Sequence, residues 1–246
     1  MKKQYEIEKY RNRQAWLQAR RIGGTDLCSI VNGVGRWGNV VSVWESLVYG
    51  VKQPLSENQA MADGRKAEEH IKELFLLRHP ELTRLSPSKA IWLVRRNDFP
   101  EITLSPDTLV KRGKDEGFVE IKLKSIYNEA SIPNYLVNIK TEEPQYYWQI
   151  IHYFIAKPDT VFGYFVVCFD VQSKDEDGNW KHSRYTIDEL YIRREDVLDD
   201  IGRGEAALED FILNSLRPKK RPEIKLEGRK EKPISWDKLS NIQTLR

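Results

Sequence analysis

The chain has 246 residues, and a hydrophobic content of 40% with seven Trp and eleven Tyr excludes a chain that is disordered throughout. A net charge of +3 gives weak support for a polyanionic partner, because a basic groove and an acidic site in one chain would cancel. Two cysteines, Cys28 and Cys168, are too few for a four-cysteine zinc or iron–sulfur site, and their apolar surroundings predict buried free thiols.

The start of the chain, MKKQYEIEKYRNRQ, is polar and lacks the apolar segment of a signal peptide. No apolar run approaches the length that spans a membrane. We therefore expect a cytoplasmic protein in a reducing environment, with no membrane contact.

Up to Pro80 the pattern predicts helices separated by glycines. A loop is expected over residues 33–40, and the helices over residues 5–20, 25–30, 42–50 and 56–78. Ser42 with Glu45, and Ser56 with Gln59, match the capping box that opens a helix.

After Pro80 the chain changes to short runs rich in β-forming residues. Strands are predicted over residues 90–94, 102–110, 117–123, 161–170 and 185–193, with helices over 141–156 and 195–216. This order predicts an α/β or α+β fold with a mixed central sheet flanked by helices. We expect one domain over 1–216, made of a helical part (1–80), a sheet core (81–193) and a final helix (194–216). The basic, proline-punctuated segment 217–246 is expected to be a tail that either contacts phosphates or packs as a solvated or subunit-contacting segment.

One group of residues points to metal chemistry. Glu120 and Lys122 are two apart in a predicted strand, so both project from one face while Ile121 points into the core. A hairpin through KRGKDEG can bring Asp107 opposite Glu120. Two converging carboxylates beside an ammonium suit a hard divalent cation and phosphodiester hydrolysis. Ordinary charges on an exposed strand are the alternative.

Two further residues can extend this site. Glu68, in the long helix, could reach the same centre, or could be a solvated helical glutamate. Gln149 lies among apolar residues of a later helix, where a buried amide needs hydrogen-bond partners, either in an active site or within the core.

The ordered set W-x3-R, I-G-G-T-D, G-x3-E, S-P-D, E-I-K and a late helical Gln resembles the phage lambda exonuclease and viral recombinase (YqaJ-like) family of PD-(D/E)XK nucleases. The resemblance covers roughly residues 16–169. It implies a PD-(D/E)XK restriction-endonuclease-like core and a Mg²⁺-dependent 5′→3′ exonuclease on double-stranded DNA, with Mn²⁺ as a possible substitute. It also implies a homotrimer, and a single-strand annealing protein as partner in recombination encoded by a phage or prophage.

The same resemblance implies roles for individual positions. Metal ligands would be Glu68, Asp107, Glu120 and the carbonyl of Ile121, with Lys122 as the catalytic lysine. The 5′-phosphate would be bound by Arg20, Thr25 and Ser105, with Gln149 orienting groups nearby. Because Arg21 follows directly, the choice between the two arginines is open, and so is the number of metal ions.

The glycine-rich segment GVGRWG carries a separate hypothesis about DNA contact. Arg36 could enter a DNA groove, and Trp37 could stack on the duplex end. The alternative for Trp37 is packing within the core.

Three other functions compete with the exonuclease. A restriction or repair endonuclease would use the same metal site without a 5′-phosphate role for Arg20. A non-catalytic DNA-binding relative is opposed by the intact Asp107, Glu120 and Lys122. An iron–sulfur nuclease is opposed by the cysteine count.

Overall fold

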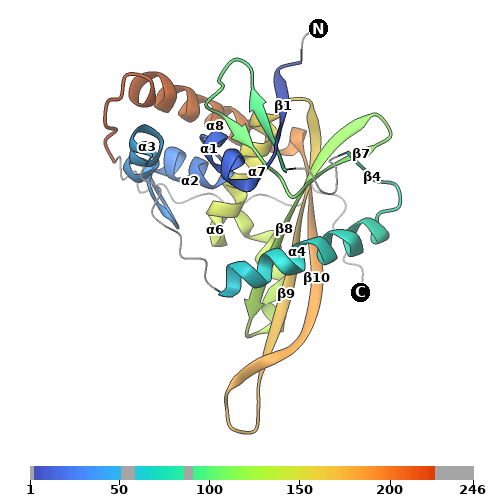
Figure 1. Cartoon of the computed structure of the whole chain (residues 1–246). Helices are drawn as coiled ribbons and strands as arrows, with labels where there is room; N and C mark the ends of the chain where they lie inside the picture. Colours follow the sequence, from blue (N-terminus) through green and yellow to red (C-terminus); the bar gives the residue numbers. More distant parts are fainter. Residues whose placement is uncertain (1–2, 51–58, 86–90, 225–246) are drawn as a thin grey trace.

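A computed structural model of the chain describes residues 3–50, 59–85 and 91–224 (Figure 1). The strands are Tyr5–Tyr10 (β1), Val34–Gly35 (β2), Gly38–Asn39 (β3), Thr83–Arg84 (β4), Ile91–Arg96 (β5), Thr103–Leu104 (β6), Thr108–Arg112 (β7), Asp115–Ile126 (β8), Thr160–Lys174 (β9) and Trp180–Arg193 (β10). The helices are Arg13–Ala19 (α1), Gly24–Asn32 (α2), Val40–Tyr49 (α3), Gln59–Arg78 (α4), Ile132–Val137 (α5), Ile139–Glu142 (α6), Pro144–Ala156 (α7) and Leu198–Phe211 (α8). Short 3-10 turns precede α5 and α8, and a π-helical turn, Ile212–Leu216, follows α8.

The central sheet has five strands in the order β10-β9-β8-β7-β4. Its neighbours pair antiparallel except β8 and β9, which run parallel. A parallel pair needs a crossover connection, and here α5, α6 and α7 supply it. The mixed sheet flanked by helices confirms the predicted fold class.

Each face of the sheet is covered by a different set of helices. On one face Phe118, Phe165 and Phe169 belong to a core that also contains the buried side chains of α2, α7 and α8. On the other face Val119 and Ile121 pack with Ile71 and Phe75 of α4. Figure 1 shows α4 crossing the sheet on that side. Successive residues of β8 therefore point to opposite layers, as strand geometry requires.

A second, smaller sheet has the order β1-β5-β6. It leads into the central sheet through the loop between β6 and β7, where Pro106 lacks an N–H for strand pairing. The long β9–β10 hairpin extends beyond the helical body in Figure 1. In the described part of the chain, no helix is long and apolar enough to cross a membrane. Both cysteines are buried thiols outside any disulfide, as predicted.

Several local predictions were wrong. Residues 5–20 are not one helix, because β1 pairs with β5 and a shorter helix starts at Arg13, capped by Asn12. The strand predicted over 102–110 is interrupted between β6 and β7. Asn39 caps α3, and Ser42 is the third residue of that helix. Residue 56, the predicted start of the long helix, lies outside the described residues.

Candidate active site

The predicted carboxylate pair lies where β7 and β8 meet. Thr108 pairs with Val119 in an antiparallel register, so Asp107, just before β7, lies opposite Glu120. Oδ2 of Asp107 accepts a hydrogen bond of 2.6 Å from the backbone N–H of Ile121. This bond ties the loop before β7 to β8 and keeps Asp107 beside Glu120.

Glu120 is almost fully buried, yet both of its carboxylate oxygens have donors. Oε1 accepts hydrogen bonds from Nζ of Lys122 and, at 2.6 Å, from Nε2 of Gln149. Oε2 accepts a hydrogen bond of 2.6 Å from the hydroxyl of Tyr153. Three donors offset the cost of removing the carboxylate from water, and they fix its orientation.

The charges of this cluster shift its proton affinities. Burial raises the pKa of Asp107 well above its usual range, and the carboxylates of Glu120 and Glu68 add to that effect. Burial opposes the charge of Lys122, but the carboxylates of Glu120 and Asp107 outweigh it, so the pKa of Lys122 is raised. Lys122 is therefore an ammonium donor in this arrangement rather than a base.

Glu68 approaches the cluster from α4. Burial raises its pKa, an effect that Lys72 opposes and Glu120 reinforces. Nζ of Lys72 lies 3.6 Å from Oε1 of Glu68, and Lys72 itself is almost fully buried. The carboxylate of Glu68 thus interacts electrostatically with both Lys72 and Glu120, although Nζ of Lys72 lies closer to Glu69, at 2.9 Å.

The donor set suits an oxygen-seeking divalent cation. Two carboxylates face each other in a site where like charge already disfavours ionisation of Asp107. Oε1 of Gln149 is a buried acceptor without a hydrogen-bond partner among the described residues. Over the same residues, however, no three His, Cys, Asp or Glu side chains stand together as a metal-holding group. The full ligand set of Glu68, Asp107, Glu120 and Ile121 stays a prediction.

Two residues of the predicted phosphate site, Arg20 and Ser105, are linked through Trp16. Nε1 of Trp16 and Oγ of Ser105 each lie 3.2 Å from the carbonyl oxygen of Trp92, to which both donate. The guanidinium carbon of Arg20 lies 4.7 Å from the centre of the Trp16 ring. The structure therefore brings Arg20 and Ser105 together through Trp16.

Arg21 faces a different surface. It lines a cavity of about 430 Å³ together with Glu101 and Leu216. The guanidinium of Arg217 binds Glu101 at 2.8 Å, so this cavity lies beside the C-terminal segment. Of the two neighbouring arginines, Arg20 is the one that stacks on Trp16.

Thr25 lies in the first turn of α2, which packs directly on the donors of Glu120. A Cβ placed on Gly24 would lie 2.7 Å from Cγ of Gln149 and 3.0 Å from the Tyr153 ring, so only glycine fits that approach. The N-terminal turn of a helix presents N–H groups and partial positive charge, which favour an anion. The helix end that carries Thr25 is therefore seated beside the carboxylate site.

The β2–β3 hairpin lies next to the start of α7. Trp37 is 55% exposed and its ring centre lies 6.0 Å from that of Tyr146, so Trp37 is not a core residue. Nη1 of Arg36 binds Oε2 of Glu143 at 3.1 Å. Nζ of Lys122 lies 5.3 Å from the Tyr146 ring. A row of side chains thus connects Lys122 through Tyr146 to the exposed hairpin.

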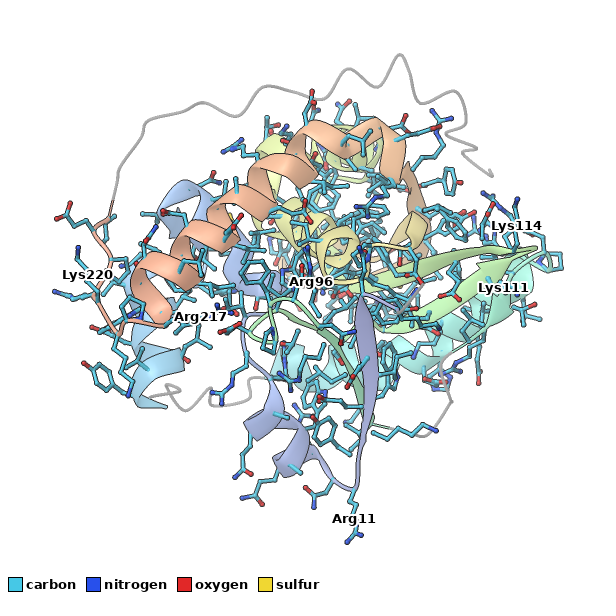
Figure 2. All side chains as sticks on the ribbon, turned by 90° about the horizontal axis from the view of Figure 1, so that it is seen from above. Arg11, Arg96, Lys111, Lys114, Arg217 and Lys220 are labelled. Carbon is cyan, nitrogen blue, oxygen red and sulfur yellow. The ribbon has the colours of Figure 1, made fainter. Side chains whose placement is uncertain are left out.

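Other basic side chains are dispersed. In Figure 2, Lys111 and Lys114 lie at the β7–β8 turn, Arg11 projects at another edge, and Arg217 and Lys220 follow α8 at the opposite end. These labelled cations therefore do not form one patch.

Sequence reasoning missed two residues of this site, Tyr146 and Tyr153. Tyr153 is four residues after Gln149 on α7, which places both on one helical face. That spacing was visible in the sequence, but many aromatic residues of α7 are simply core. Only the contact with Glu120 distinguishes Tyr153 from them.

A mixed sheet with a parallel crossover, and an Asp facing a Glu-x-Lys strand at its end, defines the PD-(D/E)XK nuclease class of fold. The model of the YqaJ-like viral recombinase domain matches residues 15–156, more than half of the chain. The chain therefore belongs to the YqaJ-like viral recombinase family, as its motifs predicted.

Two solved structures of one enzyme share this fold. An alkaline exonuclease (LHK-Exo) from Laribacter hongkongensis is 18% identical with a TM-score of 0.55, covering 85% of this chain and 96% of that one. The same enzyme in complex with dAMP gives 16% identity and a TM-score of 0.54, with coverage of 84% and 94%. A phage-related exonuclease from Haemophilus somnus gives 15% identity and a TM-score of 0.49, with coverage of 82% and 98%. Comparison with curated proteins finds no match.

Proposed function

We propose that this protein is a divalent-metal-dependent exonuclease that digests double-stranded DNA from a 5′-phosphorylated end in the 5′→3′ direction. The observation that carries the proposal is Asp107 facing Glu120, with the ammonium of Lys122 held on the Glu120 carboxylate. Membership of a recombinase family and the fold of alkaline exonucleases support the same class of reaction.

The proposed metal ligands and Lys122 have different roles in the reaction. Glu68, Asp107, Glu120 and the carbonyl of Ile121 would hold Mg²⁺, or Mn²⁺ in its place. When bound, the ion supplies charge neutralisation at the scissile phosphate and a more acidic water. The Nζ of Lys122 is charged and close to both carboxylates, so it can donate to a phosphate oxygen as negative charge grows there.

The proposed 5′-phosphate pocket consists of Arg20, Thr25 and Ser105, with Gln149 between this pocket and Glu120. A guanidinium can bind a terminal phosphate with two parallel hydrogen bonds, and the first turn of α2 adds N–H donors. The contact of Gly24 with Gln149 supports a pocket next to the site of cleavage.

Arg36 and Trp37 are proposed to contact DNA beside this pocket. An exposed indole offers a stacking surface that tolerates any base. Glu143 and the ring of Tyr146 fix where the hairpin lies relative to Lys122.

The product of this reaction is a duplex with a 3′ single-stranded end. A single-strand annealing protein is the class of partner that uses such a product in recombination. We further propose a homotrimer, which sedimentation or light scattering would detect, and action in the cytoplasm of a bacterial host on behalf of a phage or prophage.

The test uses linear duplexes with and without a 5′-phosphate, with Mg²⁺, and compares wild type with Lys122→Ala. Wild type should digest the phosphorylated strand from its 5′ end, and Lys122→Ala should bind DNA without cutting it. Cleavage by Lys122→Ala at the rate of wild type would refute the mechanism. Equal digestion of duplexes with and without a 5′-phosphate would refute the proposed role of Arg20. Cleavage of covalently closed circles would favour the endonuclease instead.

A further inference from the structure

One buried hydroxyl group, that of Tyr153, holds the carboxylate of Glu120. The hydroxyl of Tyr153 donates to Oε2 of Glu120 at 2.6 Å and accepts from Nε2 of Gln149 at 2.7 Å. The same amide donates to Oε1 of Glu120 at 2.6 Å. Gln149, Tyr153 and Glu120 therefore form a closed triangle of hydrogen bonds, in which each carboxylate oxygen has its own donor.

The triangle is held rigidly. Tyr153 is 3% exposed, and the ring of Phe118 packs edge-on against it with a centroid distance of 5.0 Å. Gly24 of α2 packs against the side chain of Gln149 and the ring of Tyr153, and this contact leaves no room for a Cβ on Gly24. This packing on both sides keeps the hydroxyl beside Glu120, to whose Oε2 it donates.

We propose that Tyr153 is a positioning residue that fixes the rotation of the Glu120 carboxylate, so that this carboxylate and Asp107 present oxygens to one divalent cation. The inference rests on the proposed function and names a residue that the family motifs do not include. Groups that orient a metal-binding carboxylate typically change metal affinity or activity by about 10- to 100-fold when removed.

The hydroxyl and the ring of Tyr153 make separate contacts, the hydroxyl with Glu120 and the ring with Gly24. Gln149 and Tyr153 contact both Glu120 and the first turn of α2, where the proposed phosphate pocket begins. Loss of the hydroxyl should therefore disturb the alignment of the cation site more than the binding of DNA, because the apolar packing against Gly24 remains.

The test is Tyr153→Phe, with Tyr147→Phe as the matched control. Tyr147 is a fully buried tyrosine of the same helix, and its hydroxyl donates to Asp200 of α8, outside the site. For each protein, calorimetry measures the affinity for Mg²⁺, nuclease assays give kcat and KM for 5′-phosphorylated duplex, and thermal unfolding reports the stability of the fold.

The expected result is that Tyr153→Phe binds Mg²⁺ about tenfold more weakly and has a lower kcat, with KM for DNA within about twofold of wild type. Tyr147→Phe should keep the metal affinity of wild type even if it unfolds at a lower temperature. A Tyr153→Phe variant with unchanged metal affinity overturns the inference and leaves the proposed function standing. Equal losses of metal affinity in both variants overturn it as well, since the effect would then be one of stability. A wild type that neither binds Mg²⁺ nor cuts DNA overturns both.

Discussion

His152 should make the fold sensitive to acid. It is fully buried on α7, with Nε2 donating to the carbonyl oxygen of Thr103 at 2.8 Å. Nδ1 has no hydrogen-bond partner within the described ranges, so a proton added there would be buried without an acceptor. Burial, aided by the charges of Arg20 and Arg96, lowers the pKa of His152 to about 4.

The size of the effect follows from the difference between the folded and unfolded proton affinities. An unfolded histidine has a pKa of about 6.5, so between that value and about 4 the unfolded chain binds more protons than the folded one. Stability therefore falls as pH falls through this window. The free energy of unfolding should drop by about 2 kcal/mol at pH 5, and by about 3 kcal/mol at pH 4.

Urea denaturation of wild type and His152→Gln at pH 7 and pH 5 measures how much unfolding free energy is lost through His152. The glutamine variant starts from lower stability at pH 7, but it should lose about 2 kcal/mol less than wild type on acidification. His70→Gln, which replaces an exposed histidine of α4, should behave as wild type does. Identical pH dependence of wild type and His152→Gln would refute the reasoning.

Three other substitutions test separate contacts. Gly24→Ala should cost about 1–3 kcal/mol of stability and reduce cleavage, because its Cβ would clash with α7, whereas Gly202→Ala on α8 has free space and should raise the unfolding temperature. Glu189→Gln should remove about 1–2 kcal/mol of stability at pH 6 and less at high pH. In wild type the hydrogen bond to Glu189 raises the pKa of His79, so the stability that this bond contributes is lost as pH rises through that pKa. Urea denaturation of both proteins at several pH values measures this difference. Trp37→Ala should weaken DNA binding by about 1–3 kcal/mol in a titration, with unfolding unchanged.

The central carboxylates could be predicted because their geometry is local. Strand alternation puts Glu120 and Lys122 on one side, and the short turn between β7 and β8 sets the register that brings Asp107 opposite. The predicted bounds of the helix capped at Asn39 and of the buried strand β9 likewise lie close to the observed ones. Helix caps and continuous apolar runs depend on neighbouring residues, so the sequence shows them directly.

Long-range pairing accounts for the main errors. The segment Tyr5–Tyr10 alternates and is as compatible with a strand as with a helix, and its partner Ile91–Arg96 lies far along the chain. Strand formation there depends on that partner, which periodicity alone does not reveal. The role of Tyr153 could not be predicted for a related reason. It is one tyrosine among the aromatic core residues of α7, and only its hydrogen bond to Glu120 of β8 distinguishes it.

Helix α7 explains why fold and site are hard to separate in this protein. Gln149 and Tyr153 bind Glu120, while His152, one residue from Tyr153, holds the strand that leads to Ser105 and Asp107. A protonated His152 would strain the same segment that positions the carboxylates. Lys122 keeps its charge at low pH, but acid also protonates Asp107, whose pKa burial raises well above the usual range. Cleavage should therefore be lost at a higher pH than the folded fraction, because the loss of about 2 kcal/mol that His152 causes at pH 5 is small beside the stability of a domain. Activity that falls only together with the folded fraction would place the acid limit in the fold instead.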